Sequence, residues 1–440
     1  MLTNLFKKLD QPISAIPFVS FRIVFGLLMA FSAIRFVYLG WIDDHYIHPE
    51  FHFTYFGFSW VKPISAAALY LLHLLMMLAA FGVALGRLYR ISAIVLFLTF
   101  TYTELIDLTY YLNHYYFVSL ICLWLIFIPE PDAKNTIPAW CKWLIMFQLG
   151  VVYTYAGLAK INYDWLIEAL PLRIWLPAHD DLPLIGKLLT FPETAYVFSW
   201  FGMIYDCTIV FFLLYNRTRP FAYITVIIFH ILTGLLFQIG VFPLVMIGAT
   251  LIFFSENWHK RFQQIIAQIP LLGRLFVVLP SGEMERSRYH MSFFLRTVFT
   301  GYIIFQVVFP WRYLLYPGNL FWTEEGYRFS WRVMLVEKAG DATFFVKDSQ
   351  TGREGIVYNR EFLNAHQEKQ MAYQPDMILQ FAHFLGKHYS QNGVSKPEVR
   401  AEVYVTMNAR PAQLLIDPKV DLMKVQDNWS PKSWILPVKE

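Results

Sequence analysis

Lys160 is the residue whose surroundings most clearly indicate chemistry. An apolar, aromatic run over 139–158 precedes it, and Asn162, Asp164 and Trp165 follow it closely. The charged form of a lysine at the edge of hydrocarbon is costly, which makes the neutral amine available as a base. A lone lysine at the end of a membrane helix more commonly extends its charge towards the lipid headgroups. Here the nearby Asp164 and Trp165 predict instead that a polar and an aromatic side chain surround the amine.

Other polar residues interrupt apolar runs at a depth that matches that of Lys160. They lie on further segments of the chain: Asp43, Asp44, His45, His48 and His52; Glu104, Asp107, Asn113 and His114; and His230 and Gln238. Any one of them is more often structural, as a helix cap or a histidine bonded to a carbonyl. Ionisable residues that converge at one depth are together typical of a functional site in a membrane protein. The residues alone leave a transport path and a catalytic pocket both open.

We predict no metal site. The spacing of His45, His48 and His52 matches no zinc motif. The three cysteines lie in or beside apolar runs without a paired spacing, so neither a metal site nor a disulfide framework is indicated.

The composition sets the class of the protein. Of its 440 residues, 57% are hydrophobic, 18% aromatic and only 15% charged, whereas a soluble domain has about a quarter charged residues. The net charge of +4 gives no indication of a nucleic-acid partner. Apolar runs of about 20 residues recur along the first three quarters of the chain, which predicts a multi-pass membrane protein.

Nine spans can be read from the hydrophobicity. They lie near 14–38, 65–86, 91–109, 115–129, 139–158, 193–214, 220–238, 242–255 and 293–310. Lysine and arginine are in excess on the cytoplasmic side of membrane proteins. Here they fall in alternate connections: Lys7 and Lys8, Arg87 and Arg90, Lys134, Arg217 and Arg219, and five more over 256–292. The N-terminus is then cytoplasmic, and the part after the ninth span lies outside the cytoplasm.

The composition changes after about residue 310. Alternating residues over 327–358, with a turn at 348–352, predict a β-hairpin. Pro375 and Asp376 open an amphipathic helix over 375–390, and 399–406 alternates again as a strand. The fold class we predict is a multi-pass α-helical bundle over 1–310, with a mostly β extracytoplasmic domain over 311–440. Such a domain suits the binding of an external macromolecule.

The chain resembles the vitamin K-dependent gamma-glutamyl carboxylases over nearly its whole length. The segment 153–165, with Gly157 and Lys160, resembles the family's catalytic-lysine motif, and Asn113 and His114 resemble the motif of its second catalytic residue. The stretch 229–242 is similar to a third motif. Matches continue in the exterior domain: Trp322, Gly326, Tyr327, Ser330, Trp331, Gly352, Arg353, Asp417, Asp421, Trp429 and Trp434. They separate this chain from proteins that share only the horizontally transferred transmembrane domain.

The sequence also departs from the animal members of that family. Ala159 stands where they carry a second lysine, the cysteines of their disulfide have no evident counterparts, and the chain stops soon after Trp434. We therefore expect a bacterial relative in the inner membrane, with its C-terminal domain in the periplasm. These differences weaken what the resemblance implies about substrate recognition more than what it implies about the chemistry.

The resemblance implies a mechanism. Lys160 removes a proton from a reduced naphthoquinone, vitamin K or a menaquinol, that lies in the apolar bundle. The quinolate reacts with O₂, and the resulting alkoxide removes a γ-proton from a glutamate of a protein or peptide substrate. CO₂ captures the carbanion, which yields gamma-carboxyglutamate and the quinone epoxide. An apolar site keeps water from quenching the strong base.

The same resemblance suggests which residues serve this reaction. His114 acts at the carboxylation step. The residues expected to bind or orient the quinol or the substrate are Asn113, Tyr155, Asp164, Trp165, His230, Gln238 and Phe242. Arg173 is a further candidate for pairing with the glutamate carboxylate, and a contact with a lipid headgroup explains it equally well.

A second reading belongs to another class of protein. The bundle could bind a quinone or lipid, or transport a solute, without any carboxylation, because polar residues inside membrane helices also occur in transporters. Transporters break paired helices with glycine or proline within the membrane, and the predicted spans mostly lack such breaks.

Overall fold

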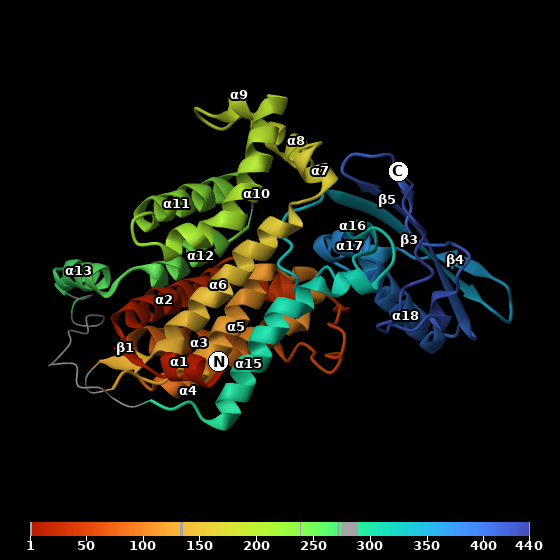
Figure 1. Cartoon of the computed structure of the whole chain (residues 1–440). Helices are drawn as coiled ribbons and strands as arrows, with labels where there is room; N and C mark the ends of the chain where they lie inside the picture. Colours follow the sequence, from red (N-terminus) through yellow and green to blue (C-terminus); the bar gives the residue numbers. More distant parts are fainter. Residues whose placement is uncertain (1, 133–134, 238, 271–272, 274–288, 440) are drawn as a thin grey trace.

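The computed structural model describes residues 2–132, 135–237, 239–270, 273 and 289–439. Apolar helices pack into an elongated bundle, and a smaller domain with a β-sheet lies at one end of it (Figure 1). The site residues that the sequence indicates belong to the bundle and to the connections at this end.

Each predicted span forms a helix. These helices are α2 Ile16–Tyr38, α3 Ala66–Leu85, α4 Tyr89–Ile106, α5 Asn113–Phe127, α6 Ala139–Ala159, α10 Pro192–Leu214, α11 Arg219–Leu236, α12 Phe242–Thr250 and α15 Phe293–Val308. Over the described residues, six stretches are long and apolar enough to cross a membrane: α2, α3, α4, α10, α11 and α15 with the turn that extends it to Leu315. By length and composition the count is therefore six and not the nine that we predicted.

The three remaining helices explain the difference. α5 and α12 are apolar but shorter than a full span. α6 has 21 residues, yet it carries Lys142 and Gln148 and is buried along most of its length. Polar side chains of membrane helices face the interior of the bundle, where neighbouring helices shield them from lipid, so an interior helix does not need a wholly apolar surface.

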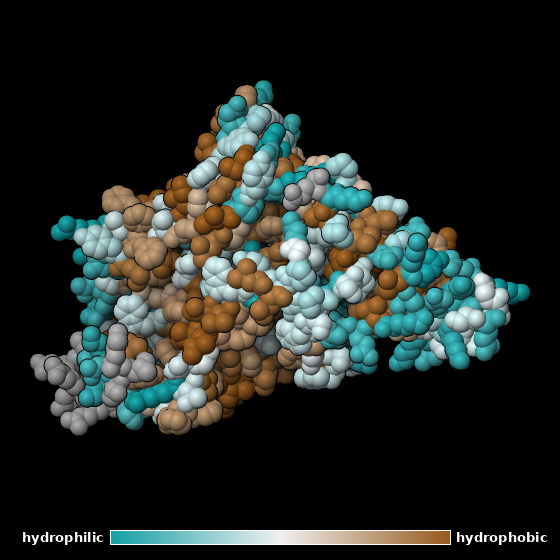
Figure 2. Space-filling model, turned by 45° about the vertical axis from the view of Figure 1, so that its right-hand side comes forward, coloured by the Kyte–Doolittle hydropathy of each residue, from teal (hydrophilic) through white to brown (hydrophobic). Residues whose placement is uncertain are grey.

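The outer surface of the bundle is apolar. On α11, for example, Phe221, Ile224, Ile228, Ile231 and Leu235 are all more than half exposed. Figure 2 shows a broad hydrophobic surface over the bundle and a mostly hydrophilic surface over the β-sheet domain. Exposed apolar side chains over several helices match a bundle that is surrounded by lipid.

Short elements close the two ends of the bundle. β1 Pro12–Ser14 pairs with β2 Thr136–Pro138, and these strands lie with α13 Glu256–Ala267 at the end far from the β-sheet domain (Figure 1). α13 contains Lys260 and Arg261. The short helices α7 Tyr163–Leu166, α8 Leu172–Trp175 and α9 Gly186–Leu189 connect α6 to α10 at the other end. Lys134 and the basic residues over 274–288 lie outside the described residues.

The C-terminal domain contains the predicted hairpin, helix and strand. β3 Lys338–Asp348 pairs antiparallel with β4 Glu354–Ile356 and with β5 Pro397–Met407, and β6 Gln413–Leu414 completes the order β4-β3-β5-β6. α18 Pro375–Gln391 begins at its proline and covers one face of the sheet, with α17 Ala365–Met371 beside it. Alternate residues of β5 are buried in the core against α18, as a strand with one covered face requires.

The two parts of the chain share contacts. Phe53, Tyr55 and Leu108, from connections between the bundle helices, lie in the hydrophobic core of the C-terminal domain. Asp107 accepts a hydrogen bond of 2.7 Å from Gln367 of α17. The C-terminal domain is thus held against the end of the bundle that carries Lys160.

Candidate functional site

A cavity of about 110 Å³ lies at this end of the bundle, among α6, α10, α11 and α12. Its wall is almost wholly apolar and rich in aromatic rings. The lining residues are Val152, Tyr153, Ala156, Lys160, Trp165, Leu172, Trp175, Phe198, Gly202, Asp206, Phe229, His230, Thr233, Phe237, Ile239, Phe242, Met246, Val333 and Met334. The last two come from the segment that leads into the C-terminal sheet, so both parts of the chain enclose the cavity.

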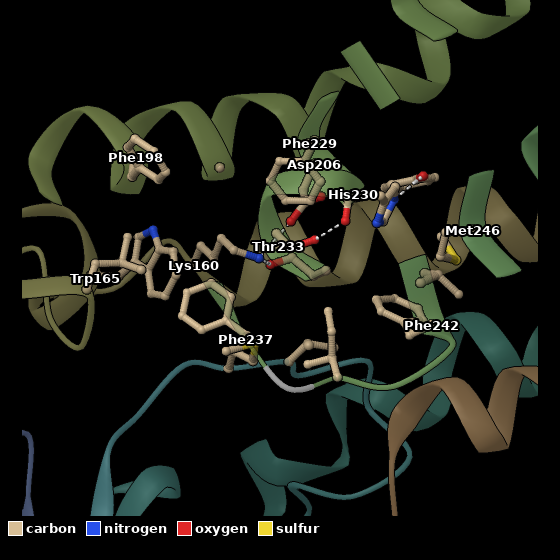
Figure 3. Close-up of a pocket in the computed structure, with 18 of the residues that line it drawn as sticks. Lys160, Trp165, Phe198, Asp206, Phe229, His230, Thr233, Phe237, Phe242 and Met246 are labelled. Atoms are coloured by element: carbon tan, nitrogen blue, oxygen red, sulfur yellow. Dashed lines mark hydrogen bonds and ion pairs between the residues drawn. The ribbon is translucent and has the colours of Figure 1, made fainter. Parts of the chain in front are cut away.

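Lys160 lies in this cavity with a partner that we did not predict. It directly follows α6, and its Nζ donates to Oδ2 of Asp206 at 2.6 Å and to the carbonyl oxygen of Ala156 at 3.2 Å. Lys160 is 7% exposed and Asp206 is 5% exposed. Figure 3 shows the amine directed towards Asp206 of α10. The acidic side chain beside the amine, which we expected to be that of Asp164, is therefore that of Asp206.

Gly157 explains why α10 approaches the end of α6 so closely. A Cβ atom at Gly157 would lie 2.6 Å from Sγ and 2.7 Å from the backbone nitrogen of Cys207. Only a glycine leaves room for this contact, and the contact brings the neighbouring Asp206 level with Lys160. Gly202, one turn earlier on α10, faces the stem of Lys160, because its Cβ would lie 3.9 Å from Cε of the lysine.

Trp165 forms the aromatic side of the lysine site, as the sequence indicates. Nζ of Lys160 lies 5.3 Å from the centre of the indole ring, within the range of a cation–π contact. The indole Nε1 donates to the carbonyl oxygen of Ser199 on α10 at 2.9 Å. Asn162 accepts a hydrogen bond from the backbone of Trp165 at 3.0 Å and so starts α7. The indole is fixed on both sides.

His230 lies on the wall opposite Trp165 (Figure 3). Its Nε2 shares a hydrogen bond of 3.0 Å with the hydroxyl group of Tyr153, whereas its buried Nδ1 has no partner among the described residues. The ring of Phe242 meets the imidazole edge-on, with centroids 5.7 Å apart. His230 thus has one ring nitrogen fixed by the protein and one unused.

His114 lies behind the cavity and does not line it. In the first turn of α5, it is 7% exposed and stacks on Phe242 with ring centroids 5.0 Å apart. Its Nε2 is buried and has no hydrogen-bond partner within the described part of the chain. A buried polar nitrogen without a partner is costly, so its position needs an explanation, of which a functional role is one.

Asn113 connects the bundle to the wall of the cavity. Its side-chain amide donates to the carbonyl oxygen of Arg332 at 2.6 Å and accepts from the hydroxyl group of Tyr111 at 3.0 Å. Arg332 directly precedes Val333 and Met334, which line the cavity. Asn113 therefore positions that wall and does not itself line the cavity.

Three other predicted residues do not line the cavity, and their binding roles stay predictions. Both oxygens of Asp164 accept hydrogen bonds from Arg410, at 2.6 and 2.8 Å, in the connection between β5 and β6. Tyr155 donates to the carbonyl oxygen of Val307 on the side of α6 that faces α15. Arg173 lies 3.7 Å from a half-exposed Glu168. Gln238 lies outside the described residues.

Asp206 and Tyr153 are the members of the site that sequence reasoning missed. Asp206 is a single acidic residue inside an apolar span, and such a residue usually has a buried partner. Tyr153 and Ala156 precede Lys160 by seven and four residues, which places all three on one face of a helix with 3.6 residues per turn. Tyr155 precedes it by five residues and points elsewhere. Both signals were present in the sequence.

Comparison with known families agrees with the two-part architecture. A model of the HTTM domain matches residues 10–258, which is more than half of the chain. A model of the vitamin K-dependent gamma-carboxylase lumenal domain matches residues 291–440. No solved structure matches the chain. With both domains present in this order, the chain belongs to the vitamin K-dependent gamma-glutamyl carboxylase family.

Proposed function

We propose that this protein is a peptidyl-glutamate carboxylase that couples oxidation of a reduced naphthoquinone to its epoxide with formation of gamma-carboxyglutamate. The observation that carries the proposal is the Lys160–Asp206 pair at the edge of an otherwise apolar cavity. An aromatic ring that carries a hydroxyl group fits such a site. The rings of Trp165, Phe237 and Phe242 would hold the quinol, and the buried pair would bind its hydroxyl group.

The residues around the cavity have distinct tasks in this proposal. Lys160 receives the proton of the bound hydroxyl group, and the aromatic walls exclude water. Oxidation of the quinol by O₂ supplies the strong base that removes the γ-proton of glutamate before CO₂ adds. His114, with an unused ring nitrogen on the far side of Phe242, serves the carboxylation step.

We assign the C-terminal domain to the protein substrate and to the periplasmic side of a bacterial inner membrane. β4 is an edge strand whose three residues are exposed, and Ile356 within it is 71% exposed. An extended peptide can add to such an edge through backbone hydrogen bonds. Ile356 directs its backbone N–H to this open edge, because the backbone groups of Arg353 and Val357, which alternate with it along the strand, are the ones bonded to β3. Ile356→Pro should then raise the KM for a protein substrate and spare a short peptide, whereas equal effects on both would indicate a structural role.

The activity can be tested directly in membranes that contain the protein. They are incubated with reduced vitamin K, labelled bicarbonate and a glutamate-rich peptide, and both the quinone epoxide and gamma-carboxyglutamate are measured. We expect both products, and neither from membranes with Lys160→Ala. Quinol binding without either product would instead favour a non-enzymatic quinone-binding or transport protein.

A further inference from the structure

Asp206 is the acidic partner of Lys160 in the cavity. It is 5% exposed in the apolar helix α10. Among the described residues it forms an ion pair with Lys160, at 2.6 Å, and with no other cation. A carboxylate without a cation would be very costly in this setting. The lysine and the aspartate must therefore be considered as one unit.

The surroundings of Nζ are those of an ammonium group. One N–H bond is directed to Asp206, one to the carbonyl oxygen of Ala156, and the indole face of Trp165 lies 5.3 Å away. A carboxylate, a carbonyl oxygen and an aromatic face all stabilise positive charge. If the amine were neutral and Asp206 ionised, the cavity would hold an uncompensated negative charge. The sequence suggested a neutral lysine beside Asp164, and the structure instead pairs the amine with the carboxylate of Asp206.

We propose that Asp206 accepts, through Lys160, the proton that the bound hydroxyl group releases. This inference rests on the function proposed above. Lys160 passes one of its own protons to Oδ2 of Asp206, and the electron pair left on its nitrogen forms a new N–H bond as the O–H bond of the quinol breaks. The pair changes from neutral to singly positive while the quinol becomes singly negative. Lys160 stays an ammonium group and serves as the counter-ion of the quinolate.

Other titratable groups also face the pair. They are Tyr153 from α6, Tyr205 and Cys207 from α10, and His230 from α11. Tyr153 and His230 are hydrogen-bonded to each other. In their ordinary neutral forms none of the four compensates a carboxylate, which leaves Lys160 for that task.

The test compares Asp206→Asn with Asp206→Glu, and uses Glu193→Gln, an exposed acid on the same helix, as the matched control. A lone neutral lysine would keep or gain activity when the carboxylate is removed, because its amine would lose its proton more easily. Our proposal requires the opposite. We expect epoxide formation to fall about 100-fold or more in Asp206→Asn, in the range of general acid–base effects. It should survive in part in Asp206→Glu and be unchanged in Glu193→Gln.

A second measurement does not depend on turnover. A small amine-specific reagent reacts with neutral Lys160, and peptide mass spectrometry reports the extent of reaction against pH in the purified proteins. The midpoint should fall by at least about one pH unit in Asp206→Asn, the size of a charge-partner effect. An unchanged midpoint, or epoxide formation that persists in Asp206→Asn, would overturn the proposal. So would equal loss in a folded Asp206→Glu.

The two measurements also separate this inference from the proposed function. If the unchanged protein forms no epoxide but the midpoint falls in Asp206→Asn, the proposed function fails, and proton sharing between Lys160 and Asp206 stands. If Asp206→Asn does not fold, Asp206→Glu decides. Epoxide formation that survives in part, with a midpoint close to that of the unchanged protein, supports the carboxylate as the required group, and loss of both in folded protein overturns it.

Discussion

Phe242 stacks on His114 with ring centroids 5.0 Å apart, and this contact separates the histidine from the cavity that holds Lys160. The same ring meets His230 edge-on at 5.7 Å. His114 and His230 are both buried, and each has one ring nitrogen without a partner among the described residues. Phe242 thus lies as a partition between the group expected to serve carboxylation and the groups expected to serve quinol oxidation.

Removal of this partition should uncouple the two half-reactions. In Phe242→Ala the space around His114 joins the cavity, and water can reach the carbanion before CO₂ does. We expect epoxide formation to continue while gamma-carboxyglutamate per epoxide falls several-fold. Phe229→Ala is the control, since Phe229 lines the cavity and contacts His230 but, among the described residues, has no ring contact with His114. If gamma-carboxyglutamate per epoxide fell equally in both variants, Phe242 would not act as a partition between the two half-reactions.

Lys160 and His114 should differ in which product they control. Lys160→Ala should abolish the epoxide and gamma-carboxyglutamate together, because every later step follows release of the quinol proton. His114→Ala should keep most of the epoxide and lose carboxylation by a factor on the order of 10²–10⁴, as for general acid–base groups. Both products are measured on the same purified protein. Parallel loss of both products in His114→Ala, with less folded protein, would indicate a structural histidine.

Asp164 and Arg410 should contribute stability that depends on pH. The hydrogen bonds from Arg410, the largest cause, lower the pKa of Asp164 below its ordinary value, and Asn408 adds to this. A lowered folded-state pKa means that the contribution is complete above the unfolded pKa of about 3.9 and is lost as the pH falls through the folded value. Since both side chains are partly exposed, we expect about 1 kcal/mol at neutral pH.

Thermal unfolding of purified Asp164→Asn, Arg410→Gln and the double variant measures this contribution. The coupling between the two residues should be complete at pH 7, should begin to decline near about pH 4, the ordinary aspartate pKa, and should be lost as the pH falls through the lower pKa of folded Asp164. Each single variant should also loosen the C-terminal domain from α7. Coupling that persists unchanged at pH 3 would show that the carboxylate is not the group responsible.

The orientation of the chain in the membrane can be tested with a single introduced cysteine. The turn 349–352 between β3 and β4 is exposed, and we expect it to face the periplasm because the basic connections lie on the opposite side. Gln350→Cys should react with a membrane-impermeant thiol reagent in intact cells. The unmodified chain, whose Cys122 and Cys141 are buried, gives the background. Reaction only after lysis would reverse the topology.

The helices and strands, and Lys160 as one member of the lysine–aspartate pair, could be predicted from local patterns in the sequence. Alternation predicts the β3–β4 hairpin, and Pro375 marks the start of α18, because both signals lie within a few residues of one another. Lys160 stands out because it ends an apolar run. Asp206 is 46 residues further on, and its pairing with Lys160 depends on how α6 and α10 pack, which no local pattern states. Asp164 was misplaced because closeness in sequence suggested contact, whereas the turn at Asn162 directs it to Arg410.

Gly157 tests whether the close packing of α6 on α10 creates the lysine–aspartate pair. In Gly157→Ala the new methyl group would lie 2.6 Å from Sγ and 2.7 Å from the backbone nitrogen of Cys207, so the helices must move apart. Overpacking of this kind costs about 1–3 kcal/mol, and it should lower the melting temperature. Because Asp206 moves with α10, epoxide formation should fall more steeply than the amount of folded protein.

Gly150 provides the matched control on the same helix. Among the described residues, a Cβ atom there would meet only Cγ1 of Val210 of α10, at 3.6 Å, which is an ordinary contact. Gly150→Ala should therefore leave the melting temperature and the epoxide yield nearly unchanged. We then compare the rate of epoxide formation per amount of folded protein between the two variants. This comparison separates the effect of a longer Lys160–Asp206 distance from the effect of lower protein stability. If folded Gly157→Ala forms epoxide as fast as Gly150→Ala does, the close approach of the two helices is a matter of packing alone.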